Sequence, residues 1–494
     1  MMNKLKIHAD GKTLVCEFEP GAELHDILRD EVPDFAQPCG GNHTCGKCRV
    51  RVSGGVSEAG ENEKKLLGDA YADGIRLACF CKLTGDAEVT LGETREAKIV
   101  AWHRMPEIAY TEEGYGFAVD IGTTTVVTRL YDRATGRVLA ERMGENAQRG
   151  FGADVISRIE ACKTEGLDVL SDRIAAQLEE MAAACMAESG VTEITESVVT
   201  GNSTMLHLYE GLDPASLAVV PFTMQSSFGC RSRRTLAGAP VYLPRCIGAY
   251  VGADIVCAIL TAGLTDGGVR LLVDIGTNGE MVLAREGKLL CCATAAGPAF
   301  EGAGLSCGMP AKRGAIRKVM LQDGVQVFET VQDADPVGIC GSGILDALAI
   351  ALETENMDDS GFLEEEIDLG GVIVNQKDVR QIQLAKSAVC AGLITLMEEA
   401  DVPAESVDVF SIAGGFGSSM DLDSGKAIGL FPAALRGKTD FIGNAALGGA
   451  AMILLNREIR EKSERIADAA EEIELSASAA FMDYYVDCMS FMEF

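Results

Sequence analysis

Two identical five-residue segments have the composition of phosphate-binding turns. Val-Asp-Ile-Gly-Thr occupies residues 119–123 and returns unchanged at residues 273–277, each time after an apolar run. An apolar run that leads into small and hydroxyl residues predicts a buried strand, a tight turn and a second strand. Glycine lets the backbone approach a phosphate, threonine hydroxyls and N–H groups can bind it, and an aspartate at the strand end can hold Mg²⁺ through water. The repeat therefore predicts two similar lobes that face one nucleotide.

The residues assigned to this site follow the two copies of the segment. We expect Asp120 and Asp274 to be the catalytic carboxylates. A chance repeat at two unrelated strand ends is the alternative, but self-similarity usually marks a repeated unit. The turn residues expected to bind the nucleotide are Gly122, Thr123, Thr124 and Thr125 in the first copy and Gly276, Thr277, Asn278 and Gly279 in the second.

A third glycine-rich turn follows a strand predicted at residues 409–412. It contains Gly414, Gly415, Phe416 and Gly417. A Gly-Gly pair directly after a buried strand lets the backbone lie flat against an adenine base or a ribose. The Walker phosphate loop, G-x-x-x-x-G-K-[ST], does not occur. Two Asp-Gly-Thr turns followed by a Gly-Gly turn resemble the superfamily of actin, sugar kinases and Hsp70 chaperones. This resemblance implies an α/β fold of two RNase-H-like lobes with Mg²⁺ and ATP in the cleft between them.

Three cysteines in a glycine-rich stretch have the spacing of iron–sulfur ligands. Cys39, Cys45 and Cys48 follow a C-x5-C-x2-C pattern, and Cys79 follows after 30 intervening residues. A 2Fe–2S cluster needs four thiolates, and the N–H groups of a glycine-rich loop can point at its sulfides. Plant-type ferredoxins have C-x4-C-x2-C and a distant fourth cysteine. This loop has one extra residue in the first gap, as ferredoxins of the adrenodoxin kind do. We therefore expect these four cysteines to hold a 2Fe–2S cluster.

Other interpretations of the cysteine loop stay open. Four thiolates also make a structural zinc site, although zinc ribbons use paired C-x2-C knuckles and only one pair is close here. Cys81 is a second candidate for the fourth ligand. His43 lies in the loop and is of a type that replaces cysteine in Rieske centres, but four cysteines suffice without it.

The order of predicted elements divides the chain into three parts. A hairpin at residues 4–19 with an Asp10-Gly11 turn, a helix at 23–30 and the cysteine loop predict a β-grasp ferredoxin domain. Farther on, residues 447–469 are expected to form one long helix, and aromatic residues at the end of the chain are expected to pack in the core. The predicted parts are the ferredoxin domain 1–95, a linker 96–114 and an ATPase domain 115–494, with lobe one 115–267 and lobe two 268–494.

The overall charge excludes some classes of partner. The chain has 494 residues and a formal net charge of −31. Such a field repels DNA and anionic membranes, so we expect neither a nucleic acid nor a membrane as a partner. The first residues do not have the charged-then-apolar pattern of a secretory leader, and we expect a cytoplasmic protein whose cysteines are mostly buried hydrophobes rather than disulfides.

A ferredoxin-type module ahead of such an ATPase module resembles the family of reductive activators of corrinoid proteins. The resemblance covers nearly the whole chain. Some members carry an extra domain between linker and ATPase module, which this linker is too short to contain, and His43 stands where glycine is more usual. The motifs that carry the resemblance begin at Cys39, Leu77, Asp120, Gly201, Asp274, Gly297, Cys340 and Ala413.

The resemblance implies ATP-dependent return of a Co(II) corrinoid protein to Co(I) in anaerobic methyl transfer, with the cluster as electron donor. It implies a corrinoid protein as partner, and with it we expect an upstream donor that is a ferredoxin or a flavoprotein reductase; a homodimer stays open. A small-molecule kinase with a redox-sensing front module is the alternative, with Asp154 or Asp254 as its base. An activator of dehydratases is disfavoured, because those enzymes share a 4Fe–4S cluster between subunits. A degenerate ATPase that serves as a scaffold is disfavoured because the phosphate turns look intact.

Overall fold

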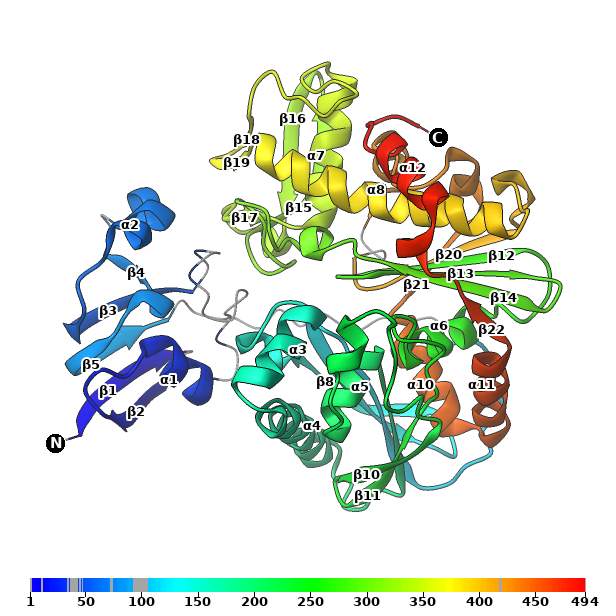
Figure 1. Ribbon diagram of the computed structural model, residues 1–494, viewed down its shortest axis with the longest axis horizontal. Helices are drawn as coiled ribbons and strands as arrows, with labels where there is room; N and C mark the ends of the chain where they lie inside the picture. Colours follow the sequence, from blue (N-terminus) through cyan, green and yellow to red (C-terminus); the bar gives the residue numbers. More distant parts are fainter. Residues whose placement is uncertain are drawn as a thin grey trace.

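The computed structural model describes residues 2–9, 12–32, 35, 43, 46, 48–71, 74–91, 105–416 and 420–493. The site residues Cys39, Cys45 and Gly417 lie outside these ranges, as does the predicted Asp10-Gly11 turn. Figure 1 shows a small N-terminal sheet beside two larger α/β bodies, lobe one and lobe two.

The N-terminal body is a five-stranded sheet in the order β2-β1-β5-β3-β4. β1 pairs antiparallel with β2 and parallel with β5, as in a β-grasp fold. Alternate residues of β1, Leu5 and Ile7, are fully buried and share one core with Leu24 and Leu28 of α1. The predicted strands of the hairpin and the helix at 23–30 are confirmed. The elements are β1 (Asn3–Ala9), β2 (Lys12–Phe18), α1 (Leu24–Glu31), β3 (Arg49–Val56), α2 (Glu61–Leu67), β4 (Ile75–Leu77) and β5 (Leu83–Thr90).

The two lobes contain sheets of equivalent topology. The strand orders are β10-β11-β9-β6-β7-β8 in lobe one and β21-β20-β12-β13-β14-β22 in lobe two. In each, three strands form an antiparallel meander, and a later strand pairs parallel with the first strand of that meander. The repeated segment lies at the end of that first strand in both lobes, so the prediction of two similar lobes is confirmed. The strands are β6 (Tyr115–Ile121), β7 (Thr125–Asp132), β8 (Arg137–Glu145), β9 (Glu196–Gly201), β10 (Cys230–Leu236), β11 (Ala239–Leu243), β12 (Arg270–Ile275), β13 (Gly279–Arg285), β14 (Lys288–Thr294), β20 (Val409–Ala413), β21 (Thr439–Gly443) and β22 (Ala470–Glu472).

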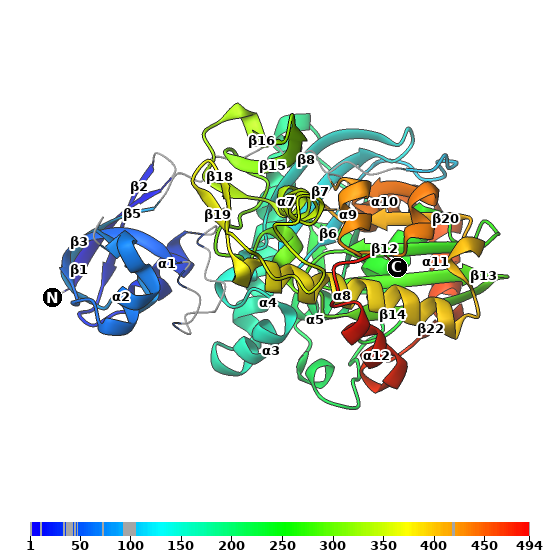
Figure 2. The same ribbon diagram turned by 90° about the horizontal axis from the view of Figure 1, so that it is seen from above.

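Helices and two small sheets cover the outer faces of the lobes (Figures 1 and 2). α3, α4 and α5 belong to lobe one, whereas α8 and α12 lie side by side on lobe two. Of the aromatic residues expected in the core, Phe491 is 2% exposed, and Phe481, Tyr484 and Tyr485 are half-buried. The bounds are α3 (Val155–Thr164), α4 (Leu167–Ser189), α5 (Ser203–Glu210), β15 (Ala315–Gln322), β16 (Val325–Thr330), β17 (Gly338–Ile339), α7 (Gly341–Glu353), β18 (Ile367–Leu369), β19 (Val372–Val374), α8 (Gln376–Glu399), α9 (Leu422–Ala427) and α12 (Ala479–Asp487).

Two apolar helices, α6 (Ala253–Ala262) and α10 (Ala445–Leu455), join the lobes in one core that takes side chains from both sheets. Every residue of α10 is buried, as expected for a helix that is apolar all round. The two helices approach very closely, because a Cβ on Gly449 would lie 2.1 Å from the Cys257 carbonyl oxygen. The small residues of α10 therefore permit this contact.

The prediction of a single helix over residues 447–469 was wrong. α10 ends at Leu455 and α11 (Arg457–Ala469) begins at Arg457, with Asn456 between them in an extended conformation. The Asn456 carboxamide oxygen accepts the N–H groups of Glu458 and Ile459, and its Nδ2 donates to the Ala109 carbonyl oxygen at 2.8 Å. The cap satisfies the first N–H groups of α11, so the chain turns there from a fully buried helix to an amphipathic one.

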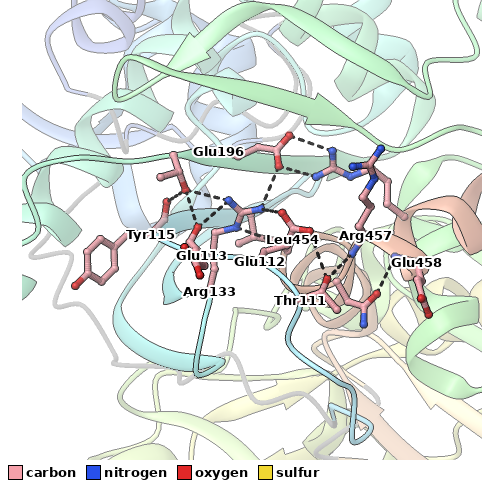
Figure 3. A network of polar contacts seen from close by, with 12 residues as sticks. Thr111, Glu112, Glu113, Tyr115, Arg133, Glu196, Leu454, Arg457 and Glu458 are labelled. Atoms are coloured by element: carbon pink, nitrogen blue, oxygen red, sulfur yellow. Dashed lines mark hydrogen bonds and ion pairs between the residues drawn. The ribbon is translucent and has the colours of Figure 1, made fainter.

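A polar network anchors the segment before lobe one to the C-terminal helices (Figure 3). The buried Arg133 guanidinium donates to the carboxylates of Glu112 and Glu196 at 3.0 and 3.2 Å and to the Leu454 carbonyl oxygen at 3.2 Å. Arg460 of α11 donates to both oxygens of Glu196. The predicted linker is thus packed against the two lobes over its described residues, 105–114.

Candidate functional site

The two predicted phosphate turns meet at the junction of the lobes. The Thr124 hydroxyl, after β6, lies 3.4 Å from the Thr277 hydroxyl, after β12. Each turn is closed by its own backbone, since the Gly122 N–H donates to the Thr125 carbonyl oxygen and the Gly276 N–H to the Asn278 carbonyl oxygen, both at 3.0 Å. The topology therefore brings together residues from the two distant copies of the motif.

Neighbouring amides hold the first turn. Asn202 caps α5 and donates from Nδ2 to the Thr123 hydroxyl at 2.9 Å. Asn146 donates from Nδ2 to the Gly122 carbonyl oxygen at 2.8 Å. Asn444, which caps α10, donates to Asp120 Oδ2 at 2.8 Å. Asn146 and Asn202 of lobe one and Asn444 of lobe two therefore hold the first turn and the strand end before it. In lobe two, the Thr277 hydroxyl donates to Glu301 Oε1 at 3.0 Å.

A group of carboxylates surrounds the two turns. Burial raises the pKa of Asp120 to about 6 and that of Asp274 to about 7, and Asp120 adds to the shift of Asp274. Burial, followed by the charges of Asp120 and Asp274, raises the pKa of Asp254 to about 8. Burial and the charges of Asp254 and Asp274 raise the pKa of Glu280 well above its usual range. Each carboxylate disfavours the charge of the next, so the site as a whole favours a bound cation.

Sequence reasoning left two members of this carboxylate group without a role in the nucleotide site. Asp254 begins α6 and had been considered only as the base of a kinase, and Glu280 follows the second turn on β13. Glu280 lies just after a glycine turn and Asp254 lies at the start of a helix. These positions are the signal that could have assigned both residues to the site. Asp154, the other kinase candidate, caps α3 by accepting the Ser157 N–H at 2.8 Å. In the described ranges, no three His, Cys, Asp or Glu side chains are grouped closely enough to hold a metal directly.

The third glycine turn also reaches the site. A Cβ on Gly414 would lie 2.5 Å from the Ile275 carbonyl oxygen, and its φ is 93°, so this position requires glycine. A Cβ on Gly415 would meet nothing within 4 Å, which leaves space beside the backbone. Phe416 is 8% exposed and stacks on Phe300 with ring centroids 5.1 Å apart. The turn thus lies against the end of β12, with room for a side chain at Gly415.

In the ferredoxin domain, two of the four predicted cluster ligands are described and lie together. Cys48 Sγ is 3.4 Å from Cys79 Sγ, and both residues are 3% exposed. A disulfide requires about 2.05 Å, whereas two thiolates on one tetrahedral metal with bonds of about 2.3 Å lie about 3.8 Å apart. The pair therefore fits two ligands of one tetrahedral metal ion. Cys81 is fully buried, and burial raises the pKa of its thiol to about 12, which disfavours the thiolate that iron binds.

Three family models match the ferredoxin domain and the two lobes. A family of 2Fe-2S iron-sulfur cluster binding domains matches residues 7–84, the RACo middle region matches 115–267, and the C-terminal domain of RACo, the ASKHA domain, matches 268–493. The corrinoid activation enzyme RamQ of Eubacterium limosum is 34% identical over 416 residues, which cover 75% of this chain and 69% of that protein.

Two further relatives are also proteins that act on corrinoid proteins, and each matches most of this chain. The Co(II) methylated amine-specific corrinoid protein reductase of Methanosarcina barkeri is 26% identical over 76% of this chain and 77% of its own. The solved structure of a reductive activator for a corrinoid, iron-sulfur protein is similar over 99% of this chain and 98% of its own, with a TM-score of 0.70 and 28% identity. Among the described residues, no helix has the length and apolarity needed to cross a membrane.

Proposed function

Because the chain belongs to the family of reductive activators of corrinoid proteins, we propose that it uses ATP to return an inactive Co(II) corrinoid protein to Co(I). The pairing of two sites carries the proposal. One is the buried thiol pair of Cys48 and Cys79, and the other is the contact of Thr124 with Thr277 between the two phosphate turns. An electron-transfer module and a nucleotide module in one chain are what an ATP-dependent reductase needs.

The ferredoxin domain supplies the electron site. Cys48 and Cys79, together with Cys39 and Cys45, would hold a 2Fe–2S cluster. When bound, the cluster supplies one electron, which the Co(II) of the partner's corrinoid accepts to become Co(I). Around the described thiols, Leu77 and Ala78 are fully buried and exclude water, which holds the site at a low dielectric constant.

The two lobes supply the nucleotide site. We propose that the turns at Thr123–Thr125 and Gly276–Gly279 bind the phosphates of ATP, and that the Gly414-Gly415 backbone lies against its base or ribose. Asp120 and Asp274 would hold Mg²⁺ through water. Burial raises the pKa of both carboxyl groups, and a bound cation would lower these pKa values because it favours the charged carboxylates. Asp254 and Glu280 extend this carboxylate group beyond the residues assigned from the sequence.

ATP is needed because the electron transfer is uphill. Plant-type 2Fe–2S centres have potentials near −400 mV, and we expect the Co(II)/Co(I) couple of the corrinoid to lie at a lower potential. Each 100 mV of deficit costs about 2.3 kcal/mol for one electron. We propose that ATP changes the conformation of the lobes or the release of the complex and does not phosphorylate a substrate. Full-rate turnover with a non-hydrolysable analogue would contradict hydrolysis as the driving step.

The remaining parts of the proposal concern partners and organisation. The upstream donor would be a ferredoxin or a flavoprotein reductase, and the protein would work in the cytoplasm. The division at residues 95, 114 and 267 is proposed as the domain organisation, and a homodimer as an oligomeric state to be tested by light scattering.

The function is tested by an anaerobic assay with absorption detection. The reduced, cluster-loaded protein is mixed with a Co(II) corrinoid protein from the same organism, with and without Mg-ATP. We expect the Co(I) band to grow only with Mg-ATP and to be lost in Cys48→Ala and Asp274→Ala. If no Co(I) forms and ATP is consumed only when a small metabolite is added, the protein is instead a kinase.

A further inference from the structure

Arg158 of α3 is a fully buried cation without a carboxylate partner. It is 0% exposed and is the largest of the fully buried side chains in the described part of the chain. Its guanidinium donates to the carbonyl oxygens of Thr123 and Gly152, the latter at 3.0 Å, to Gln148 Oε1 at 3.4 Å and to Met205 Sδ at 3.2 Å. All four acceptors are neutral. The Asp154 carboxylate, one turn earlier, instead accepts the Ser157 N–H.

A buried cation of this kind is costly unless an anion is near it. Burial takes the charge out of water, and neutral acceptors compensate only in part. Burial lowers the pKa of Arg158 to about 9, the charge of Arg149 adds to that effect, and the Asp154 carboxylate, which is not hydrogen-bonded to the guanidinium, opposes it only in part. The other buried arginine of lobe one described above, Arg133, has two carboxylate partners. Arg158 is therefore placed where an external anion would complete its surroundings.

The position of Arg158 identifies that anion. Its guanidinium bonds to the carbonyl oxygen of Thr123, and the N–H of the same peptide group belongs to Thr124. A charge-assisted bond to the carbonyl polarises the peptide, so the N–H becomes a stronger donor. Within the described ranges, the Thr124 N–H donates to no protein acceptor, whereas the Gly122 N–H already closes the turn. The positive end of this peptide is thus free to face a phosphate.

The second turn has no such support. The Thr277 carbonyl oxygen, which corresponds to that of Thr123, accepts a neutral N–H from Gly297 at 2.9 Å. The surroundings of both turns are otherwise acidic, with Asp120, Asp274 and Glu301 nearby. A polyphosphate therefore meets one turn that carries a cation behind it and one that carries carboxylates beside it.

We propose that Arg158 is a positioning residue for the nucleotide, which gives the first phosphate turn its positive charge through the Thr123–Thr124 peptide. The inference rests on the proposed nucleotide function and adds a residue to it. A purely structural role, in which Arg158 only ties the segment at 148–152 to α3, predicts equal effects on all ligands. If Arg158 instead acts through its positive charge, its removal should weaken binding more as the number of phosphates on the nucleotide increases.

The experiment measures equilibrium binding of ATP, ADP and AMP in Mg²⁺ buffer to the full chain by calorimetry. For Arg158→Met we expect a loss of affinity of about tenfold or more for ATP, less for ADP and least for AMP. Arg158→Lys should recover part of the loss for ATP. Asp154→Asn keeps a good helix cap and removes the nearby negative charge, so it should bind ATP about two- to threefold more tightly.

The outcomes separate the two proposals. Equal losses for the three nucleotides in Arg158→Met, or an unchanged ATP affinity in Asp154→Asn, would overturn the role of Arg158 and leave the nucleotide function in place. If Arg158→Met does not fold, the Asp154→Asn result decides alone. If the unmodified chain binds none of the nucleotides, the proposed nucleotide site fails, and the role of Arg158 fails with it.

Discussion

The Lys312 ammonium of lobe two lies 2.9 Å from the Glu145 carboxylate of lobe one. Glu145 ends β8 beside Thr125, in register with the first phosphate turn. The ion pair therefore bridges the two lobes next to the place where Thr124 and Thr277 meet. It would couple the relative position of the lobes to the surroundings of the proposed nucleotide site.

Breaking this ion pair should loosen the junction of the lobes. For Lys312→Ala we expect faster hydrogen exchange at residues 122–125 and 276–279, measured by mass spectrometry. The free energy of unfolding should fall by less than about 1 kcal/mol, because both side chains are partly exposed. Arg317→Ala, which breaks the Arg317–Glu329 pair within lobe two, is the matched control. Equal exchange in the two variants would show that Lys312 does not hold the lobes together.

Removing a cluster cysteine should remove iron, whereas removing its buried neighbour should not. Cys48→Ser and Cys79→Ser should each lose the visible absorption and the iron and sulfide content of the reconstituted protein. Cys81→Ser should keep them, because Cys81 packs as a buried thiol in the core. Iron and zinc analysis checks the prediction. Zinc in place of iron in the unmodified protein would favour the structural zinc site instead.

Stability should fall as pH rises in the absence of Mg²⁺. The folded chain keeps Asp274 protonated up to a pKa of about 7 and Asp254 up to about 8, whereas the unfolded chain releases these protons near pH 4. Between these values the folded state binds more protons, so the free energy of unfolding decreases with pH. Thermal unfolding from pH 5 to 8.5 should show this slope, and Asp274→Asn should flatten it. A flat or rising profile in the unmodified chain would contradict the prediction.

The same carboxylates should make Mg-ATP binding depend on pH in the opposite sense. Mg²⁺ favours their charged forms, so binding releases protons and affinity rises between about pH 6 and 8. Calorimetry in buffers with different ionisation enthalpies counts the protons released. A count of zero at pH 7 would mean that these groups do not face the metal.

The contact between α6 and α10 should tolerate no side chain at Gly449. In Gly449→Ala the new Cβ would lie 2.1 Å from the Cys257 carbonyl oxygen, and backbone must move. We expect a loss of about 1–3 kcal/mol in the free energy of unfolding, as for other overpacked cores. Gly437→Ala is the control, because its Cβ would meet nothing within 4 Å. Chemical denaturation of both variants checks the difference, and equal midpoints would contradict it.

The ferredoxin domain should be held on lobe one by Arg29 of α1. Its guanidinium lies 4.9 Å from the Phe151 ring centroid and 3.6 Å from Glu165 Oε2. For Arg29→Ala we expect faster hydrogen exchange in α1 and at residues 147–151. Lys82→Ala, which breaks the exposed pair with Glu23 inside the ferredoxin domain, should change neither region. Unchanged exchange in Arg29→Ala would show that other contacts dock the domain.

Local sequence determined the elements that carry the proposed nucleotide and iron–sulfur sites. The turns at Gly122 and Gly276 were predictable because a strand end, a glycine and hydroxyl residues act within a few positions of one another. The same holds for the helix at 23–30 and for the amphipathic strands of the ferredoxin sheet. The break at Asn456 was missed because both sides favour helix, although an asparagine between an apolar run and a charged run is a signal for the start of a new helix.

Tertiary structure decided which distant residues share a site. Asp254 lies on α6, outside the repeated motif, and Glu280 follows the second turn on β13. Burial raises the pKa of both; the charges of Asp120 and Asp274 add to the shift of Asp254, and those of Asp254 and Asp274 to the shift of Glu280. Arg158 looks like an ordinary helix residue in the sequence, and only the packing of α3 places it behind Thr123. Burial and electrostatic coupling depend on all neighbours in space, whereas the chain order records only neighbours in sequence. The sequence of this protein therefore determined which kinds of site it carries, and the fold determined which charged residues surround each site.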